Sequence, residues 1–113
     1  SCGILYYIKF IIYKVTYIIK MKWKEDKMPE ISLFYGIRVT MYYDDHNPPH
    51  FHAEYNGNKA VVDIDEARVI KGALPSRQLK LILAWCVLHQ DELMQNWELS
   101  KDGKPMNRIN PLV

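Results

Sequence analysis

The dipeptide Asn56-Gly57, set between two alternating segments, constrains the fold of this chain more than any other feature. Asn-Gly is the strongest short-range signal for a two-residue hairpin loop, because a type I′ turn needs positive φ at both central residues. A loop of two residues fixes the pairing by counting outward, so that His50 faces Asp63. The sequence therefore predicts a β-hairpin over residues 50–65.

This register gives the hairpin one apolar face and one mostly polar face. The apolar face carries Phe51, Ala53, Tyr55, Ala60, Val62 and Ile64. The opposite face carries His50, His52, Glu54, Lys59, Val61 and Asp63. A slip of one residue would turn the apolar set toward water, so the pattern specifies the register strongly.

The segments around the hairpin predict further strands and one helix. Residues 31–43 alternate between two faces, which indicates a strand, and the two prolines within residues 44–49 end it. Residues 68–71 add a short third strand to the hairpin. Pro75 favours a helix start, and residues 76–100 contain no Gly or Pro. The expected fold is α+β: a small antiparallel three-stranded sheet with one long C-terminal helix packed on its apolar face.

The predicted helix is apolar on two sides, whereas a helix that lies on a sheet needs only one apolar stripe. The first stripe consists of Leu79, Ile82, Leu83, Cys86, Leu93 and Trp97. The second consists of Leu81, Trp85, Leu88 and Leu99, which we take as a candidate partner interface. Its cover has three alternatives: the C-terminal Ile109, Pro111 and Leu112, the N-terminal segment, or a partner chain.

Residues 1–27 differ in composition from the rest of the chain. They hold six Lys against two acidic residues, and 17 of the 27 are Ile, Lys, Tyr or Phe. The apolar run over residues 4–19 is too short and too charged for a membrane span, and it lacks the order of a signal peptide. Three alternatives remain: an extension upstream of the usual start at Met28, an amphipathic segment at a membrane surface, or an additional element of the fold. We expect one globular domain over residues 28–113.

Three of the four histidines lie within seven residues of one another, next to several carboxylates. His50 and His52 are two positions apart on a predicted strand, so both side chains point to one face and can reach one metal ion. Zinc and related divalent metals favour imidazole together with carboxylate ligands, and Asp44 and Asp45 are also near. With zinc or manganese as the candidate ion, the candidate ligands are His46, His50, His52, Asp63 and Glu54.

Two roles without a metal stay open for the histidines. His50 opposite Asp63 has the form of a general base oriented by a carboxylate, and Lys59 is the nearest positive group for a phosphate. The histidines also suit loop geometry or a partner surface. Elsewhere, we expect Cys86 to be an inert core thiol and His89 to lie at the edge of the core.

Composition excludes several classes of protein. Two cysteines make neither a disulfide-dense scaffold nor a four-thiolate zinc site. Residues 28–113 hold nine basic and eleven acidic residues, which gives no strong signal for nucleic-acid binding.

Several short motifs occur in an order that resembles one bacterial family. They are Met28-Pro29-Glu30-Ile31, Phe34-Tyr35-Gly36, the run from His46 to Tyr55, Leu74-Pro75, and Trp85-x-x-x-His89-x-x-Glu92-Leu93. On these motifs, residues 28–113 resemble the family called domain of unknown function 4160, most specifically at His-Asn-Pro-Pro-His-x-His. The resemblance implies a small cytoplasmic protein, often encoded beside a second small family in an arrangement similar to toxin–antitoxin pairs. It implies no established activity and no catalytic residue.

Two functions from different classes are therefore expected. The first is a non-enzymatic interaction module, one half of a toxin–antitoxin-like pair, which would bind a small protein partner or a second copy. The second is a small metal-dependent hydrolase or nuclease that uses the histidine motif. The sequence does not decide whether the protein is an enzyme.

Overall fold

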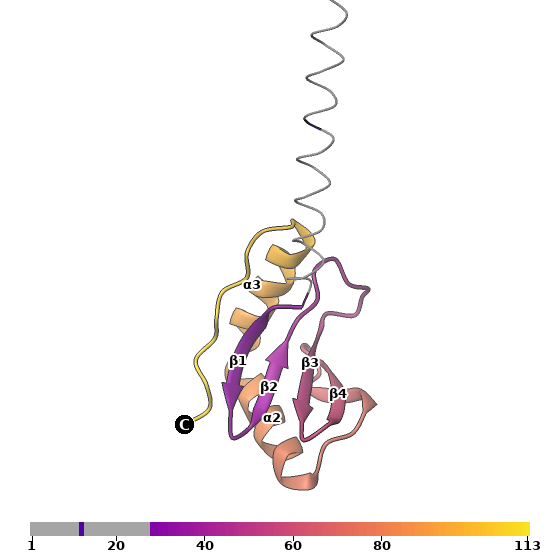
Figure 1. The fold of residues 1–113 in the computed structure, drawn as a ribbon, viewed down its shortest axis with the longest axis vertical. Helices are drawn as coiled ribbons and strands as arrows, with labels where there is room; N and C mark the ends of the chain where they lie inside the picture. The colour runs from indigo at the N-terminus through magenta and orange to yellow at the C-terminus, as the bar shows by residue number, and fades with distance from the viewer. Residues whose placement is uncertain (1–11, 13–27) are drawn as a thin grey trace, which may run out of the picture.

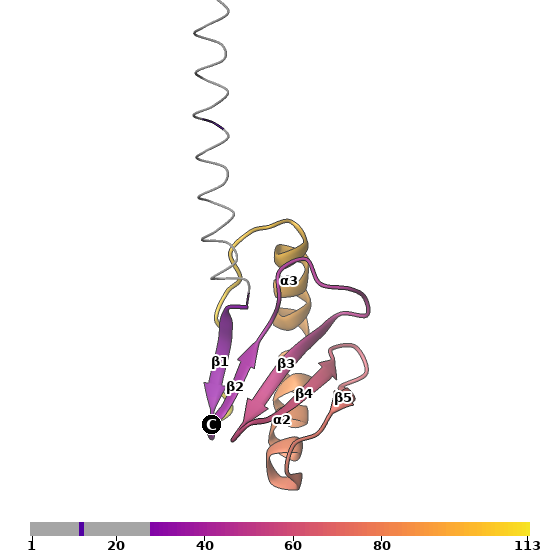
Figure 2. The same cartoon turned by 45° about the vertical axis from the view of Figure 1, so that its right-hand side comes forward.

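Within residues 28–113, five antiparallel strands follow one another along the chain and form a single sheet (Figures 1 and 2). The structure is a computed structural model that describes Ile12 and residues 28–113. The three alternatives for residues 1–27 lie outside these described residues. Each strand pairs with the next in the order β1-β2-β3-β4-β5. The strands are β1 (Glu30–Phe34), β2 (Ile37–Thr40), β3 (His50–Tyr55), β4 (Asn58–Asp63) and β5 (Arg68–Gly72).

The β3–β4 hairpin has the predicted register. His50 is opposite Asp63, and all six pairs match the counting from the two-residue loop. The loop residues Asn56 and Gly57 both have positive φ, 46° and 82°, as a type I′ turn requires. The prediction of the hairpin and of its two faces is confirmed.

The prediction of three strands is wrong, because the sheet has five. The segment 31–43 is not one strand: it reverses at Tyr35 and Gly36, whose φ angles are 49° and 77°. The reversal makes β1 and β2, and β2 joins the hairpin along β3. The residues of β2 alternate with period two by themselves. The alternating pattern therefore gave no sign of the turn at Tyr35 and Gly36 that precedes β2.

The prediction of one long helix is also wrong. The structure has α2 (Ser76–Leu88) and α3 (Gln90–Lys101), which meet at His89, where φ is −123°. Both helices lie on one face of the sheet (Figure 2). The side-chain amide of Gln90 donates to the backbone carbonyls of Ile64 and Asp65, at 2.9 and 3.1 Å. This tertiary bond ties the start of α3 to the loop after β4, and local sequence carries no signal for it.

The apolar face of the sheet and the two helices enclose the core. The residues of the first helical stripe that are fully buried are Ile82, Cys86 and Leu93. Trp85, which the sequence assigned to the second stripe, is also fully buried and packs against Phe51. Trp85 is therefore a core residue in this fold and is not exposed to a partner.

The C-terminal tail lies against the second apolar stripe of the helical segment, for which the sequence left three alternative covers. The backbone N–H of Ile109 donates to the carbonyl of Ile31 on β1 at 2.8 Å, and the indole N–H of Trp85 donates to the carbonyl of Asn110 at 2.9 Å. Figure 1 shows this tail running beside β1. The first alternative is confirmed for Trp85, while Leu88 stays 68% exposed and Leu81 and Leu99 are partly buried.

None of the helices among the described residues has both the length and the apolar character needed to cross a bilayer.

Candidate metal centre

The loop between β2 and β3 brings Asp45 beside the first residues of the central strand β3. Asp44 adopts a positive φ of 50°, and its backbone N–H donates to the carbonyl of Ser100 at 3.4 Å. The ammonium of Lys101 donates to the carbonyl of Asp45, and it also lies over the ring of Trp97. The loop is therefore held against the last turn of α3, which places the Asp45 carboxylate beside β3.

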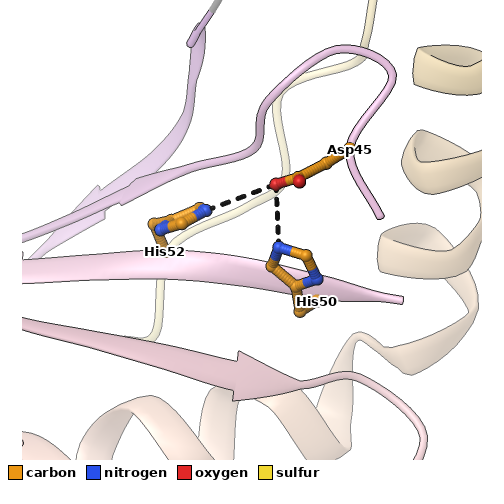
Figure 3. A group of neighbouring side chains, drawn as sticks. All are labelled: Asp45, His50 and His52. Carbon is orange, nitrogen blue, oxygen red and sulfur yellow. Dashed lines mark hydrogen bonds and ion pairs between the residues drawn. The ribbon is translucent and has the colours of Figure 1, made fainter. Parts of the chain in front are cut away.

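Asp45, His50 and His52 converge on one point (Figure 3). The Nε2 atom of His50 lies 2.9 Å from Oδ2 of Asp45, and the Nε2 atom of His52 lies 3.7 Å from the same oxygen. These three potential ligand atoms all lie within 4.8 Å of one another. Among the described residues, this is the group of histidine, cysteine and carboxylate side chains that is close enough to share one ion.

The contacts of His50 need more protons than a neutral ring carries. Its Nδ1 lies 2.7 Å from the carbonyl oxygen of Pro48, while its Nε2 faces Asp45. A neutral imidazole has one N–H, so it can donate to only one of these two acceptors. Two arrangements resolve this: a doubly protonated ring, or a cation placed between Nε2 and the carboxylate.

The Nε2 atom of His52 is buried and has no hydrogen-bond partner. Its 3.7 Å separation from Asp45 is too long for a hydrogen bond. Burial lowers the pKa of His52 below its ordinary value, and the neighbouring charges of His50 and Lys71 add to this against the opposing effect of Asp45. The fold therefore favours the neutral imidazole, which is the form that binds metals.

The carboxyl group of Asp45 is held in its ionised form. Burial alone would raise its pKa, but the hydrogen bond from the backbone N–H of His46 and the contacts with His50 and His52 outweigh burial and lower it. The ionised carboxylate of Asp45 thus lies 3.7 Å from the Nε2 atom of His52 with no hydrogen bond between them.

An open cleft of about 700 Å³ gives access to this group. Besides the three convergent side chains, the cleft is lined by Tyr42, Tyr43 and His46 from the β2–β3 loop, and by Val61, Ile70 and Lys71 from β4 and β5. The ring of Tyr42 meets the ring of His52 edge-on, with centroids 4.4 Å apart. A ligand in the cleft would therefore reach the three convergent side chains directly from solvent.

The structure brings together only two of the five candidate ligands. His50 and His52 share one face of β3, as expected. His46 is exposed outside the group and holds Asp45 through its backbone N–H. Glu54 lies farther along β3, opposite Lys59, and is not part of the group.

The expected pairing of the His50 side chain with Asp63 is absent. The two residues are opposite in register, but the Asp63 carboxylate accepts the backbone N–H of Glu66 at 2.9 Å and so caps the β4–β5 turn. His50 turns instead toward Asp45, which supplies the carboxylate. The Asp44-Asp45 pair beside the histidines was the only signal in the sequence for this role, and it did not distinguish between the two residues.

Cys86 lies in the core, as expected. Burial and the charge of Asp63 raise the pKa of its thiol to about 11. The thiol is protonated at neutral pH and is not a candidate nucleophile or ligand.

In residues 28–113, fold and site together define a small α+β domain: a five-stranded antiparallel meander with two helices on one face, and a histidine–carboxylate group in an open cleft. The chain belongs to the family described as Domain of unknown function (DUF4160), whose model matches residues 36–98. The expected membership is thereby confirmed, and the matched segment contains the whole cleft. Comparisons with curated proteins and with solved structures each found no match.

Proposed function

We propose that this protein binds one divalent transition metal ion, such as zinc or manganese, through Asp45, His50 and His52, and acts as a metal-dependent hydrolase. The observation that carries this proposal is the buried Nε2 of His52, which has no partner and lies beside the carboxylate of Asp45. A cation among the three ligand atoms would satisfy His52 and would also separate the His50 Nε2 from Asp45.

The ligand set supports a catalytic rather than a purely structural metal. Structural zinc is usually held by four protein ligands, whereas catalytic sites keep a position open. Three side chains converge here and the cleft opens to solvent beside them. The Nδ1 of His50 is fixed by the carbonyl of Pro48, which is the outer hydrogen bond that orients a metal-binding histidine. When bound, the ion would polarise a water molecule or a substrate oxygen.

The test is metal analysis of the full-length chain, with His52→Ala as the test variant and His46→Ala as the control. His46 belongs to the same motif and lines the cleft, but it lies outside the convergent group. We expect about one metal ion per chain in the wild type and in His46→Ala. We expect none in His52→Ala, whose circular dichroism should be unchanged because His52 is only half-buried.

Hydrolysis is tested on the same three proteins. The wild type and His46→Ala should cleave an activated 4-nitrophenyl ester in a metal-dependent reaction, and His52→Ala should not. A wild type without metal, or equal metal content in all three proteins, would refute the proposed site. One metal ion per chain without hydrolysis of the 4-nitrophenyl ester would support the metal centre and refute the hydrolase activity.

A protein partner is the second candidate function, as half of a toxin–antitoxin-like pair in the cytoplasm. It is supported by Val87 and Leu88, which are 58% and 68% exposed at the end of α2. Co-expression with the product of the adjacent gene should give a complex that Leu88→Asp weakens, with Val113→Asp at the exposed chain end as the control. A chain that stays monomeric in that co-expression would refute this candidate.

A further inference from the structure

The irregular pairing of β5 turns Lys71 toward the cleft. Val69 is opposite Val62 on the core face of β4, and a regular strand would then place Lys71 opposite Ala60, also on the core face. The register shifts by one residue between these pairs, so Lys71 is opposite Val61 instead. A bulge of this kind re-aims the side chains that follow it. Both Lys71 and the extra residue, Ile70, line the cleft.

Lys71 therefore lies in one row with a proposed metal ligand. His52 on β3, Val61 on β4 and Lys71 on β5 are consecutive partners across three strands, and cross-strand partners point to the same face. Adjacent strands are about 4.8 Å apart, which separates the Cα atoms of His52 and Lys71 by roughly 10 Å. The small side chain of Val61 lies between them and leaves the space above it open.

No carboxylate among the described residues forms an ion pair with Lys71. Its side chain lines the same cleft as Asp45, His50 and His52. Lys59, the cation that the sequence favoured, is opposite Glu54. It lines a smaller hollow that shares Tyr42 and His52 with the cleft, but it does not line the cleft itself. The positive charge available to a ligand in the metal cleft is therefore that of Lys71.

We infer that the cleft binds the phosphoryl group of a small phosphate ester, with one oxygen toward the metal ion held by Asp45, His50 and His52 and another toward the ammonium of Lys71. This inference rests on the proposed function and names the substrate class of that same site. Lysine is a common phosphate-binding residue, and the several oxygens of a phosphoryl group allow it to contact two cations at once. The acidic excess of residues 28–113 favours a small ester over a nucleic-acid chain.

The experiment is isothermal titration of the metal-loaded full-length chain with inorganic phosphate, with the metal content of each sample measured in parallel. Lys71→Met removes the proposed contact, and Lys59→Met is the matched control, because it removes the same charge from the neighbouring strand outside the cleft. We expect phosphate to bind the wild type and Lys59→Met equally, and Lys71→Met about ten-fold more weakly. All three proteins should hold the same amount of metal.

Two further probes separate the sources of the phosphoryl group. 4-Nitrophenyl phosphate should compete with inorganic phosphate and depend on Lys71 to the same extent. A single-stranded oligonucleotide that binds ten-fold more tightly than either would overturn the assignment to a small ester.

The outcomes also separate this inference from the proposed function. Full metal content with equal phosphate affinity in all three proteins, or with no phosphate binding, would overturn the role of Lys71 and leave the metal centre intact. A wild type without metal would overturn both. An equal loss of affinity in Lys59→Met and Lys71→Met would reduce the effect to general surface charge and overturn the inference.

Discussion

At the scale of single residues, a buried nitrogen without a hydrogen bond destabilises a fold by about 1 to 3 kcal/mol. The Nε2 of His52 is such an atom in the metal-free chain. His52→Phe keeps the ring contact with Tyr42 and removes the unpaired nitrogen. We expect the free energy of unfolding, measured by urea denaturation with a chelator, to rise by about 1 kcal/mol.

Once metal is added, we expect the wild type to be more stable than His52→Phe, because only the wild type can bind the ion. A free metal concentration of one hundred times Kd should stabilise the wild type by about 2.7 kcal/mol and leave His52→Phe unchanged. If His52→Phe is less stable than the wild type in chelator, the unpaired Nε2 does not destabilise the fold. That result would contradict the interpretation of His52 as a metal-binding residue.

The lowered pKa values of His52 and Asp45 predict that the metal-free fold loses stability in acid. The unfolded chain takes up a proton on His52 near pH 6.5 while the folded chain resists it, so stability falls as the pH drops below that value. The ionised Asp45 stabilises the fold above its unfolded value of 3.8, and this contribution is lost as the pH falls through its lower folded pKa.

This acid sensitivity can be measured by urea unfolding between pH 7.5 and 5 in the presence of a chelator. The wild type and His46→Ala should lose stability with similar slopes, and His52→Phe should lose less. The same slope in His52→Phe as in the wild type would assign the effect to other groups.

Single residues also determine which carboxylate joins His50 and His52, and the sequence could predict this group only in part. The alternation of β3 placed His50 and His52 on one face, because that depends on local geometry alone. Asp45 joins them through a loop conformation that the end of α3 stabilises by way of Ser100 and Lys101. Nothing local distinguishes Asp45 from Asp44, since the contacts that do so are distant in the chain.

At the scale of elements, the predictions that held were those with a short-range cause. The register of β3 and β4 follows from one two-residue turn, and counting outward from it was sufficient. The division into α2 and α3 has no such cause, because a bond from Gln90 to Ile64 fixes where α3 begins. The bulge of β5 likewise arises from its pairing with β4, and the sequence of β5 alone does not predict it.

Gly72 allows β5 to recover its pairing after this bulge. Its φ is 77°, and a Cβ atom there would lie 2.1 Å from the backbone oxygen of Lys59. Gly57 has a similar φ of 82° but nothing within 4 Å of such an atom. We expect Gly57→Ala to cost about 1 to 2 kcal/mol of stability from backbone strain, and Gly72→Ala about 3 to 5 kcal/mol because strain and backbone overlap add.

Urea denaturation followed by circular dichroism measures this difference. If Gly72→Ala still folds, the displaced Lys71 should also bind phosphate more weakly than in the wild type. Equal losses of stability in the two variants would mean that the edge of the sheet yields easily, and that the bulge does not hold Lys71 in place.

At the scale of the whole molecule, the C-terminal tail determines how much apolar surface remains for a partner. Ser32 donates to the carbonyl of Ile109 at 2.9 Å, and the buried side chain of Asn96 exchanges two hydrogen bonds of 2.8 Å with the backbone of Asn107. The tail thus joins the edge strand β1 to both helices. The doubly apolar helix that suggested a partner from the sequence is largely satisfied within the chain.

Deleting residues 107–113 should therefore destabilise the entire domain rather than free a surface. The deletion removes the buried Ile109, the partner of the Trp85 indole and both contacts of Asn96. Loss of one buried aliphatic side chain costs about 2 to 5 kcal/mol, and each buried polar group left unpaired about 1 to 3 kcal/mol more. Against the roughly 5 to 15 kcal/mol of a typical small domain, we expect the shortened chain to be largely unfolded at about 25 °C.

Deleting only Val113, which is fully exposed, is the matched control and should leave the midpoint of thermal unfolding unchanged. Circular dichroism and size-exclusion chromatography of both deletions measure the outcome. A shortened chain that folds as a monomer would contradict the structural role of the tail. One that folds only as a dimer would indicate that a second copy can replace the tail, and would restore the helix face as an interface.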